Sequence, residues 1–258
     1  MRRLIIEEPN SAAALWSRRL AIFAFAVAAI GVGLARAAPN DVMAGLSVLG
    51  AAFLVACVAL LFAATGAVVI WRTGRGGLSH VIGAVLLAML LLGFPAYLAV
   101  QSIRLPLMND ISTDLADPPA FSRSSAALAA RGPLTPSDVP ETTREEQRRA
   151  YPDIQPVILD LEADEAYRLT QQAVAALGWR LVDQTRPGGR SGIGRIDAID
   201  RTLVMGFPDD VTIRIRPLAG QTRIDIRSAS RFGRHDFGQN ARRIRRFALE
   251  LQTQLDAR

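Results

Sequence analysis

Two long stretches without a charged side chain constrain this chain more than any other feature. No Asp, Glu, Lys or Arg occurs from Val42 to Trp71 or from Gly76 to Ile103. Each stretch exceeds the roughly 20 apolar residues that an α-helix needs to cross the hydrocarbon core of a bilayer. A shorter run lies between Arg19 and Arg36, whose long side chains can reach the membrane interfaces. The sequence therefore predicts three transmembrane helices, at about residues 19–37, 43–71 and 78–102.

The arginines that flank these runs predict the orientation of the chain. Positive residues near short loops stay on the cytoplasmic side of a membrane. Arginines are numerous before the first run and recur between the second and third, whereas Arg36 alone follows the first. We therefore expect a cytoplasmic amino terminus and a carboxyl-terminal domain outside the cytoplasm. An alternative is a signal-peptide cleavage site at Ala35-Arg36-Ala37, where small residues flank the bond, and cleavage would leave the domain on the same side.

The composition favours a bacterial inner membrane protein with a periplasmic domain. All 30 basic residues are arginines and alanine is abundant, which is typical of a GC-rich bacterial genome. The sole cysteine, Cys57, lies inside the second run, so the external domain must fold without a disulfide. Within the apolar runs His80, near one end, is the only side chain that ionises near neutral pH, which makes a transport pathway a weak interpretation.

Small residues recur at about fourfold spacing along the second run and permit close contact between helices. These residues are Ala52, Ala56, Ala59, Ala63 and Ala67. The alternative explanation is an alanine-rich genome without a packing role.

Residues 104–156 are rich in proline, with Ser, Thr and acidic residues between the prolines. Such a composition predicts an extended linker or an arm that wraps around a domain. Two pieces, at 109–121 and 151–156, combine turn-forming residues with apolar anchors and could dock on the domain that follows.

Residues 157–258 read as a soluble α+β domain with a mostly antiparallel sheet flanked by two helices. We expect a short strand at 157–159, a helix that ends at Gly178, strands at 179–183, 193–199 and 202–206, and a last helix from about Phe237. Between them we expect a structural turn formed by Phe207, Pro208, Asp209 and Asp210.

A hairpin of residues 211–216 and 222–227 follows from the alternation of isoleucines with charged residues. Only a register that pairs Arg216 with Arg223 puts both isoleucine sets on one face. The same register places Arg214 opposite Asp225. We expect the isoleucine face to be the core and the arginine face to be solvated.

The segment 227–240 is the candidate site, because it brings arginines, hydroxyls and glycines to the start of the last helix. Free backbone N–H groups and guanidinium groups at such a place suit a phosphate or a carboxylate. The candidate anion-binding residues are Arg227, Ser228, Ser230, Arg231, Arg234, His235, Asn240 and Arg242. The expected ligand is an anionic lipid headgroup, an envelope polymer or an acidic protein partner. The alternative is that these arginines pair with Asp110, Asp114, Asp117, Asp209 or Asp210.

Other chemistries have weaker support in the sequence. A periplasmic hydrolase could use His235 as a base with Ser228 or Ser230 as nucleophile, but no Gly-x-Ser-x-Gly elbow surrounds either serine. No Cys or His pair has metal-ligand spacing, so neither a metal nor another cofactor is expected. Nucleic acid is excluded as a partner despite the net charge of +6, because the domain is placed outside the cytoplasm and its basic tail lacks interleaved aromatics.

Three segments resemble the family called domain of unknown function 1499. They are Asp197–Val211 with its Gly206-Phe207-Pro208-Asp209-Asp210, then Arg227-Ser228-Ala229-Ser230-Arg231-Phe232-Gly233, then Asp236-Phe237-Gly238. The resemblance covers about Asn109 to Leu255. It supports the domain boundary and the envelope setting but implies no established activity and no catalytic residues. Members often carry an Asn-Cys-Val type motif where this chain has Asn109-Asp110-Ile111, so any role of that cysteine is absent here.

Overall fold

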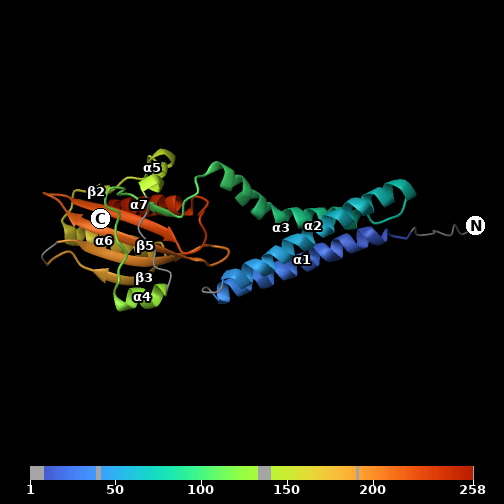
Figure 1. The fold of residues 1–258 in the computed structure, drawn as a ribbon, viewed down its shortest axis with the longest axis horizontal. Coiled ribbons are helices and arrows are strands. Elements are labelled where there is room, and N and C mark those ends of the chain that lie inside the picture. The colour runs from blue at the N-terminus through green and yellow to red at the C-terminus, as the bar shows by residue number, and fades with distance from the viewer. Residues whose placement is uncertain (1–8, 39–41, 133–140, 190–191, 258) are drawn as a thin grey trace, which may run out of the picture. The chain divides into compact units, whose positions relative to one another are not determined.

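A computed structural model describes residues 9–38, 42–132, 141–189 and 192–257 (Figure 1). The chain forms two compact units, one made mainly of residues up to Val100 and the other mainly of residues from Gln101 onward. Each unit has its own packed interior, and each is described by itself.

The first unit consists of three long apolar helices, as predicted. They are α1 (Ala12–Ala37), α2 (Val42–Thr73) and α3 (Leu78–Arg104). All three are long and apolar enough to cross a membrane. The helix α1 begins seven residues before the predicted span, because Ala12-Ala13-Ala14-Leu15 are strong helix formers.

Small residues form the contact between α1 and α2, which confirms the packing role predicted for the alanine series. Ala52, Ala56, Ala59 and Ala63 are buried, and Ala67 is partly buried. Glycines bring the two backbones closer still: a Cβ atom added to Gly45 would lie 2.8 Å from the amide nitrogen of Ala35. The helices are therefore held by van der Waals packing of close backbones.

The second unit is an α+β domain built on a six-stranded antiparallel sheet, as predicted. The strands are β1 (Asp110–Ser112), β2 (Val157–Leu159), β3 (Arg180–Thr185), β4 (Gly194–Arg201), β5 (Pro208–Pro217) and β6 (Thr222–Ser230). Their order is β1-β6-β5-β4-β3, and β2 also pairs with β6. The helices are α4 (Ser125–Arg131), α5 (Glu141–Ala150), α6 (Ala163–Ala176) and α7 (Gln239–Asp256).

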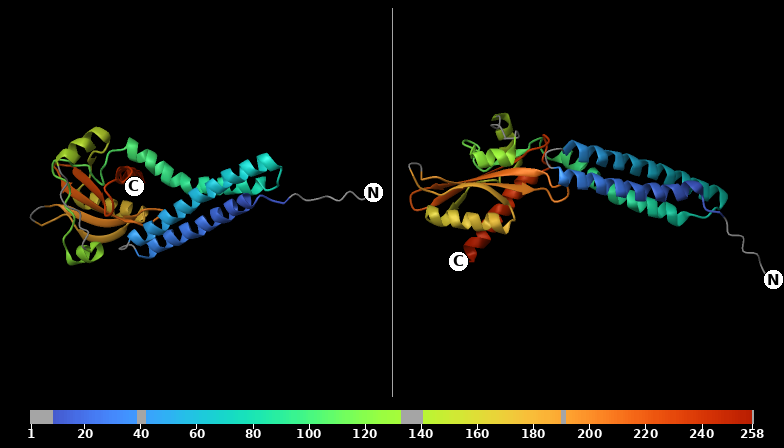
Figure 2. Two further views of the ribbon diagram at one scale, coloured as in Figure 1. Left: turned by 45° about the vertical axis from the view of Figure 1, so that its right-hand side comes forward. Right: turned by 90° about the horizontal axis from the view of Figure 1, so that it is seen from below.

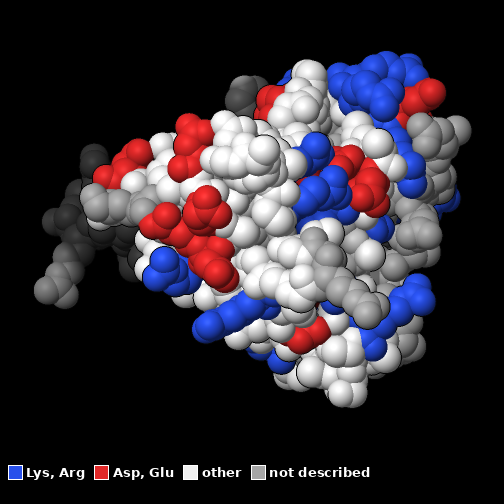
Figure 3. Space-filling view, turned by 90° about the vertical axis from the view of Figure 1, so that its left-hand side faces the viewer, with Lys and Arg blue, Asp and Glu red and all other residues white. Residues whose placement is uncertain are grey.

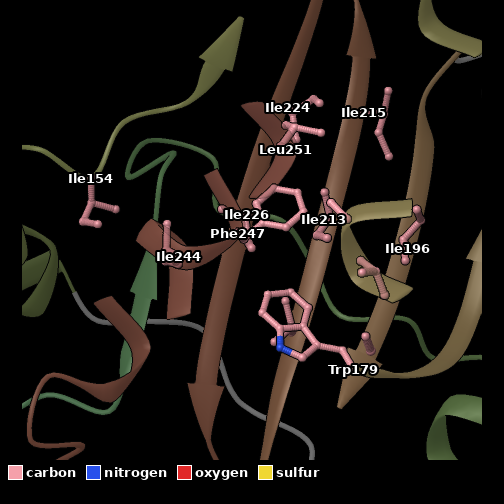
Figure 4. Close-up of a cluster of buried hydrophobic side chains, with 14 of the residues drawn as sticks. Ile154, Trp179, Ile196, Ile213, Ile215, Ile224, Ile226, Ile244, Phe247 and Leu251 are labelled. Carbon is pink, nitrogen blue, oxygen red and sulfur yellow. The ribbon is translucent and has the colours of Figure 1, made fainter. Parts of the chain in front are cut away.

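The predicted hairpin register is confirmed: Arg216 pairs with Arg223, and Arg214 pairs with Asp225. Ile196 of β4 and the isoleucines of β5 and β6 thereby share one face, which packs against α6 and α7 (Figure 4). In this core the rings of Trp179 and Phe247 stack with their centroids 5.9 Å apart. The helix α6 ends as expected at Gly178, which has a φ of 69°.

The opposite face of the sheet is covered by protein, so the prediction of a solvated face is wrong. Thr212 and Asp225, which point to that face, are fully buried. The covering segment is the proline-rich stretch, which is the wrapping arm and not a free linker. It contains β1, α4 and α5, and Figure 2 shows α4 on the side of the sheet opposite to α6 and α7. We call residues 105–132 the arm.

A side chain closes the outer edge of β1. Gln147 of α5 accepts a hydrogen bond from the Ser112 N–H at 3.1 Å and donates one to the Ser112 carbonyl at 2.6 Å. The side-chain amide thus bonds to the N–H and carbonyl of Ser112 as a neighbouring strand would. It covers an edge that would otherwise be open to pairing with another chain.

Around the candidate segment, three element boundaries differ from the sequence prediction. The bend predicted at 207–210 lies at 203–205, where a strand was expected, and Pro208, Asp209 and Asp210 begin β5. Proline is tolerated there because the first residue of a strand does not need its N–H in the ladder. The strand β6 extends to Ser230, so Arg227, Ser228 and Ser230 lie in a strand and not in a loop. The helix α7 begins at Gln239, two residues later than expected.

Candidate anion-binding site

Two of the three segments that carry the family resemblance lie side by side in the sheet. The start of β5 pairs with the end of β6, so that Asp209 lies opposite Ser230 and Asp210 opposite Ala229. Because successive residues of a strand point to opposite faces, the two aspartates face different layers. Asp209 points toward α7, and Asp210 points toward the arm.

On the α7 side, Arg243 is the centre of a buried polar cluster. Its guanidinium group donates to Asp209 at 2.6 Å, to Asp200 at 2.7 Å, to Asn240 at 2.7 Å and to Ser228 at 3.0 Å. Burial raises the pKa of Asp209, and the charge and hydrogen bond of Arg243 oppose that rise. Ser228 also donates to Asn240, at 2.7 Å. The cluster therefore satisfies its own donors and acceptors.

On the arm side, two arginines enclose the carboxylate of Asp210. Arg231 binds it with two hydrogen bonds of 2.8 and 2.9 Å, and Arg131 of α4 donates to it at 3.1 Å. Arg131 also donates to Asp197 at 2.7 Å. Burial raises the pKa of Asp197, while the N–H of Ser122 and the guanidinium of Arg131 act in the opposite direction. These ion pairs fasten α4 to the sheet.

Arg227 is held in the same way by the beginning of the arm. Its guanidinium binds Asp110 of β1, with a shortest distance of 2.7 Å, and lies over the ring of Phe121 at 4.9 Å. The guanidinium of Arg131 lies over the same ring at 5.0 Å. Phe121 thus contacts both cations, and no face of Arg227 is left for an external ligand of any size.

The remaining acidic residues of the arm also bind the sheet. Arg214 pairs with Asp117 at 2.8 Å, with Asp225 at 2.9 Å and with Asp114 at 3.0 Å. Figure 3 shows a face of the domain near whose centre acidic and basic side chains lie next to one another. The alternative that the sequence left open for the candidate segment, ion pairs with these aspartates, is thus found for Arg227 with Asp110 and for Arg231 with Asp210.

The loop between β6 and α7 and the first turn of α7 are tied to the start of the arm, and we call these residues, 231–242, the base segment. The Asn109 amide donates to the Gly233 carbonyl at 2.7 Å, and the Asp236 N–H donates to the Met108 carbonyl at 3.0 Å. The Asn240 amide donates to the Asn109 carbonyl at 2.9 Å and to the Ser230 hydroxyl at 3.1 Å. The base segment therefore lies against the residues that directly follow α3.

Both ring nitrogens of His235 are engaged by the backbone. Its Nδ1 accepts from the Phe237 N–H at 2.9 Å, which leaves the proton on Nε2, 3.3 Å from the Leu105 carbonyl. Ser228 is fully buried against Asn240 and Arg243, and Ser230 accepts from Asn240. In the described part of the chain neither serine bonds to His235. The pairing of nucleophile and base that a hydrolase requires is therefore not formed in this structure.

Part of the positive charge near the start of α7 is compensated within the domain. Asp236 caps the helix, because its two carboxylate oxygens accept from the N–H groups of Gly238 and Asn240, both at 2.8 Å. Arg245 binds Asp153 at 2.6 Å. Cations are unfavourable at the amino end of a helix, and the carboxylates of Asp236 and Asp153 offset part of this cost.

Three exposed arginines remain around the base segment, and we call them the base arginines. They are Arg104, Arg234 and Arg242, and none of them pairs with a carboxylate among the described residues. Arg242 donates to the Phe237 carbonyl at 2.9 Å and otherwise faces solvent. Of the eight residues predicted to bind an anion, Arg234 and Arg242 are the two whose guanidinium groups are exposed.

Neither cavities nor groups of metal-binding side chains indicate another site in the described part of the domain. A shallow cavity of about 350 Å³ lies between the arm and the sheet, lined by Pro118, Pro119, Thr185, Arg195 and Arg214 among others. Within the described residues no group of three or more His, Cys, Asp and Glu side chains could hold a metal ion.

The family model described as "Protein of unknown function (DUF1499)" matches residues 110–251, more than half of the chain. The chain belongs to this family. The DUF1499 match begins at the first residue of β1 and ends inside α7, so it includes the arm together with the sheet. No curated protein matches the chain.

Sequence reasoning missed several members of the two buried clusters in this DUF1499 domain. Arg131 and Asp197 complete the cluster around Asp210, and Asp200 completes the one around Arg243. Asp197 carried a usable signal, since a charged residue between Ile196 and Ala198 must face the layer opposite the core. Arg131 carried none, because it follows a short alanine-rich stretch that shows no relation to the sheet.

Proposed function

We propose that the protein is an integral membrane protein of a bacterial inner membrane whose DUF1499 domain lies in the periplasm and binds an anionic ligand without catalysis. The distribution of arginines around the three apolar helices supports this orientation. The observation that carries the binding proposal is the group of base arginines, which are exposed and lack a carboxylate partner among the described residues.

Guanidinium groups at that place suit phosphate or carboxylate groups, because their planar N–H donors match the spacing of two acceptor oxygens. Lipid headgroups, anionic envelope polymers and acidic proteins all present such groups. The buried arginines act differently: Arg227, Arg231 and Arg243 are saturated by Asp110, Asp210 and Asp209, so they hold the scaffold that presents the base segment.

The test is native mass spectrometry of the full-length protein extracted gently with its lipids. In the Arg234→Gln/Arg242→Gln variant we expect the loss of an anionic species that accompanies the wild type. Both side chains are exposed, so their replacement leaves the buried ion pairs intact. Binding should also weaken as the salt concentration rises, since the Debye length shrinks from about 8 Å at 0.15 M to about 3 Å at 1 M.

A charge-matched control is the Arg168→Gln/Arg180→Gln variant, which removes two exposed arginines from α6 and β3. This control should retain the anionic species. Equal retention by both double variants, or binding that is indifferent to salt, would contradict the proposal.

A further inference from the structure

Two large aliphatic side chains are exposed on either side of Arg104, where α3 ends. Ile103 is 87% exposed and Leu107 is 56% exposed. Single exposed aliphatic residues are common on protein surfaces. These two differ because they lie at and just beyond the end of a helix that is long and apolar enough to cross a membrane. Their position is where a membrane-spanning helix passes from hydrocarbon to headgroups, and an aliphatic side chain there can remain in lipid.

The base segment lies within a few residues of this helix end. His235 contacts the carbonyl of Leu105, the residue that directly follows α3. Arg234 precedes that histidine and follows Gly233, whose carbonyl binds Asn109. Arg234 is therefore held on both sides by contacts to residues 105–109.

Arg242 lies at the same place. A Cβ atom added to Gly238 would lie 3.1 Å from a methyl carbon of Leu105 and 3.3 Å from a guanidinium nitrogen of Arg242. Both atoms border the same side of Gly238, so the guanidinium of Arg242 is a near neighbour of Leu105. The three base arginines thus surround the point at which the chain leaves α3.

We propose that the anionic ligand is the phosphate of phospholipid headgroups in the membrane that α3 spans, with the base arginines on the phosphates and Ile103 and Leu107 in the adjoining acyl region. This assignment rests on the proposed function and names its ligand. The covalent path supports it: Leu105, which His235 contacts, directly follows Arg104, and one residue spans at most about 3.6 Å. Each interfacial layer of a bilayer is about 5–8 Å thick, so a step of one residue stays within that layer.

The experiment uses the full-length protein in nanodiscs that contain equal amounts of phosphatidylglycerol and phosphatidylcholine. Native mass spectrometry after release from the nanodiscs counts the lipids of each class that stay bound. We expect enrichment of phosphatidylglycerol on the wild type. Each arginine near an anionic surface should contribute about fivefold to this enrichment at low salt. The Arg104→Gln/Arg234→Gln/Arg242→Gln variant should therefore lose at least about tenfold.

Two further variants separate charge from apolar contact. The Arg123→Gln/Arg168→Gln/Arg180→Gln variant removes three exposed arginines elsewhere on the domain and should keep the enrichment. The Ile103→Ser/Leu107→Ser variant keeps all the charges but should retain fewer lipids of both classes. Full retention of lipid by this variant would overturn the assignment of the two aliphatic residues to the acyl region.

A second experiment measures the binding of soluble polyphosphate to the protein in neutral detergent without phospholipid. Polyphosphate binding that depends on Arg234 and Arg242, with no preference for phosphatidylglycerol in nanodiscs, would overturn the lipid assignment and leave the proposed function standing. If neither the polymer nor the lipid depends on the base arginines, both proposals fail.

Discussion

At the scale of single residues, Asp209 and Asp210 are neighbours in the sequence but belong to clusters on opposite faces of the sheet. Each buried carboxylate is matched by arginines from another segment. Breaking a buried ion pair by removing one partner costs about 3–5 kcal/mol, because the other charge stays buried without compensation. We therefore expect Arg131→Met, which leaves Asp197 short of its main partner, to lower the free energy of unfolding by about that amount. Urea unfolding of the detergent-solubilised protein, followed by near-ultraviolet circular dichroism, measures the change. Arg123→Met, at an exposed position of the same arm, should stay within about 0.5 kcal/mol of wild type, and an equal effect of the two substitutions would refute the role of Arg131.

A second prediction at the scale of single residues concerns how the stability of the domain depends on pH. The hydroxyl of Ser122 donates to Asp183 and lowers the pKa of that carboxyl below its ordinary value of 3.8. A lowered pKa in the folded state contributes stability above pH 3.8 and loses it as the pH falls through the folded value. Ser122→Ala should therefore destabilise the domain at neutral pH, and part of that loss should disappear in acid. The bond from the Ser124 N–H to the same hydroxyl is lost at every pH, so only the pH-dependent part reports on Asp183. Thermal unfolding from pH 7 to pH 3 measures it, and in an Asp183→Asn background the dependence should be absent. Burial raises the pKa of Asp110, Asp197 and Asp209, so their contribution has the opposite sign and declines as the pH rises above 3.8.

At the scale of elements, the edge of β1 depends on one amide of α5. Gln147 makes two hydrogen bonds to Ser112, and it is buried. Each lost bond that leaves a buried backbone group unsatisfied costs about 1–3 kcal/mol. Gln147→Ala should therefore speed amide exchange in a peptide that covers 110–113, and Arg148→Ala, its exposed neighbour, should not. Hydrogen exchange with mass spectrometry gives both rates. Unchanged exchange in Gln147→Ala would show that β1 is held by its pairing with β6 alone.

The elements also show how far the sequence determines this fold. The hairpin of β5 and β6 and its register were predictable, because alternation of Ile213, Ile215, Ile224 and Ile226 with charged residues admits one pairing that buries them all. The covering of the opposite face was not predictable. It depends on pairs such as Asp114 with Arg214 and Arg131 with Asp210, which join residues about 80 to 100 positions apart by polar contacts that have no periodicity. The position of the candidate segment before α7 was predictable from the sequence. The burial of Arg227 and Arg231 was not, because it depends on the same kind of polar contact. Each of these arginines has one serine and one apolar residue as its direct neighbours, and this pattern does not indicate which side of the strand or loop the arginine occupies.

At the scale of the whole molecule, the membrane topology determines which compartment contains the DUF1499 domain. This topology can be tested by labelling single cysteines. Cys57 is the sole cysteine, so a Cys57→Ser background has no thiol. In that background Ala219→Cys places a thiol at the exposed turn between β5 and β6, and Thr73→Cys places one at the end of α2. The positive-inside rule puts the loop after α2 in the cytoplasm, because it carries Arg72 and Arg75, and puts the turn outside. We expect a membrane-impermeant maleimide to label Ala219→Cys in intact spheroplasts, and to label Thr73→Cys only after the membrane is opened. The opposite pattern would place the domain in the cytoplasm, where the base arginines would meet the inner leaflet and cytoplasmic anions, and the periplasmic assignment would fall while the binding experiments retained their meaning.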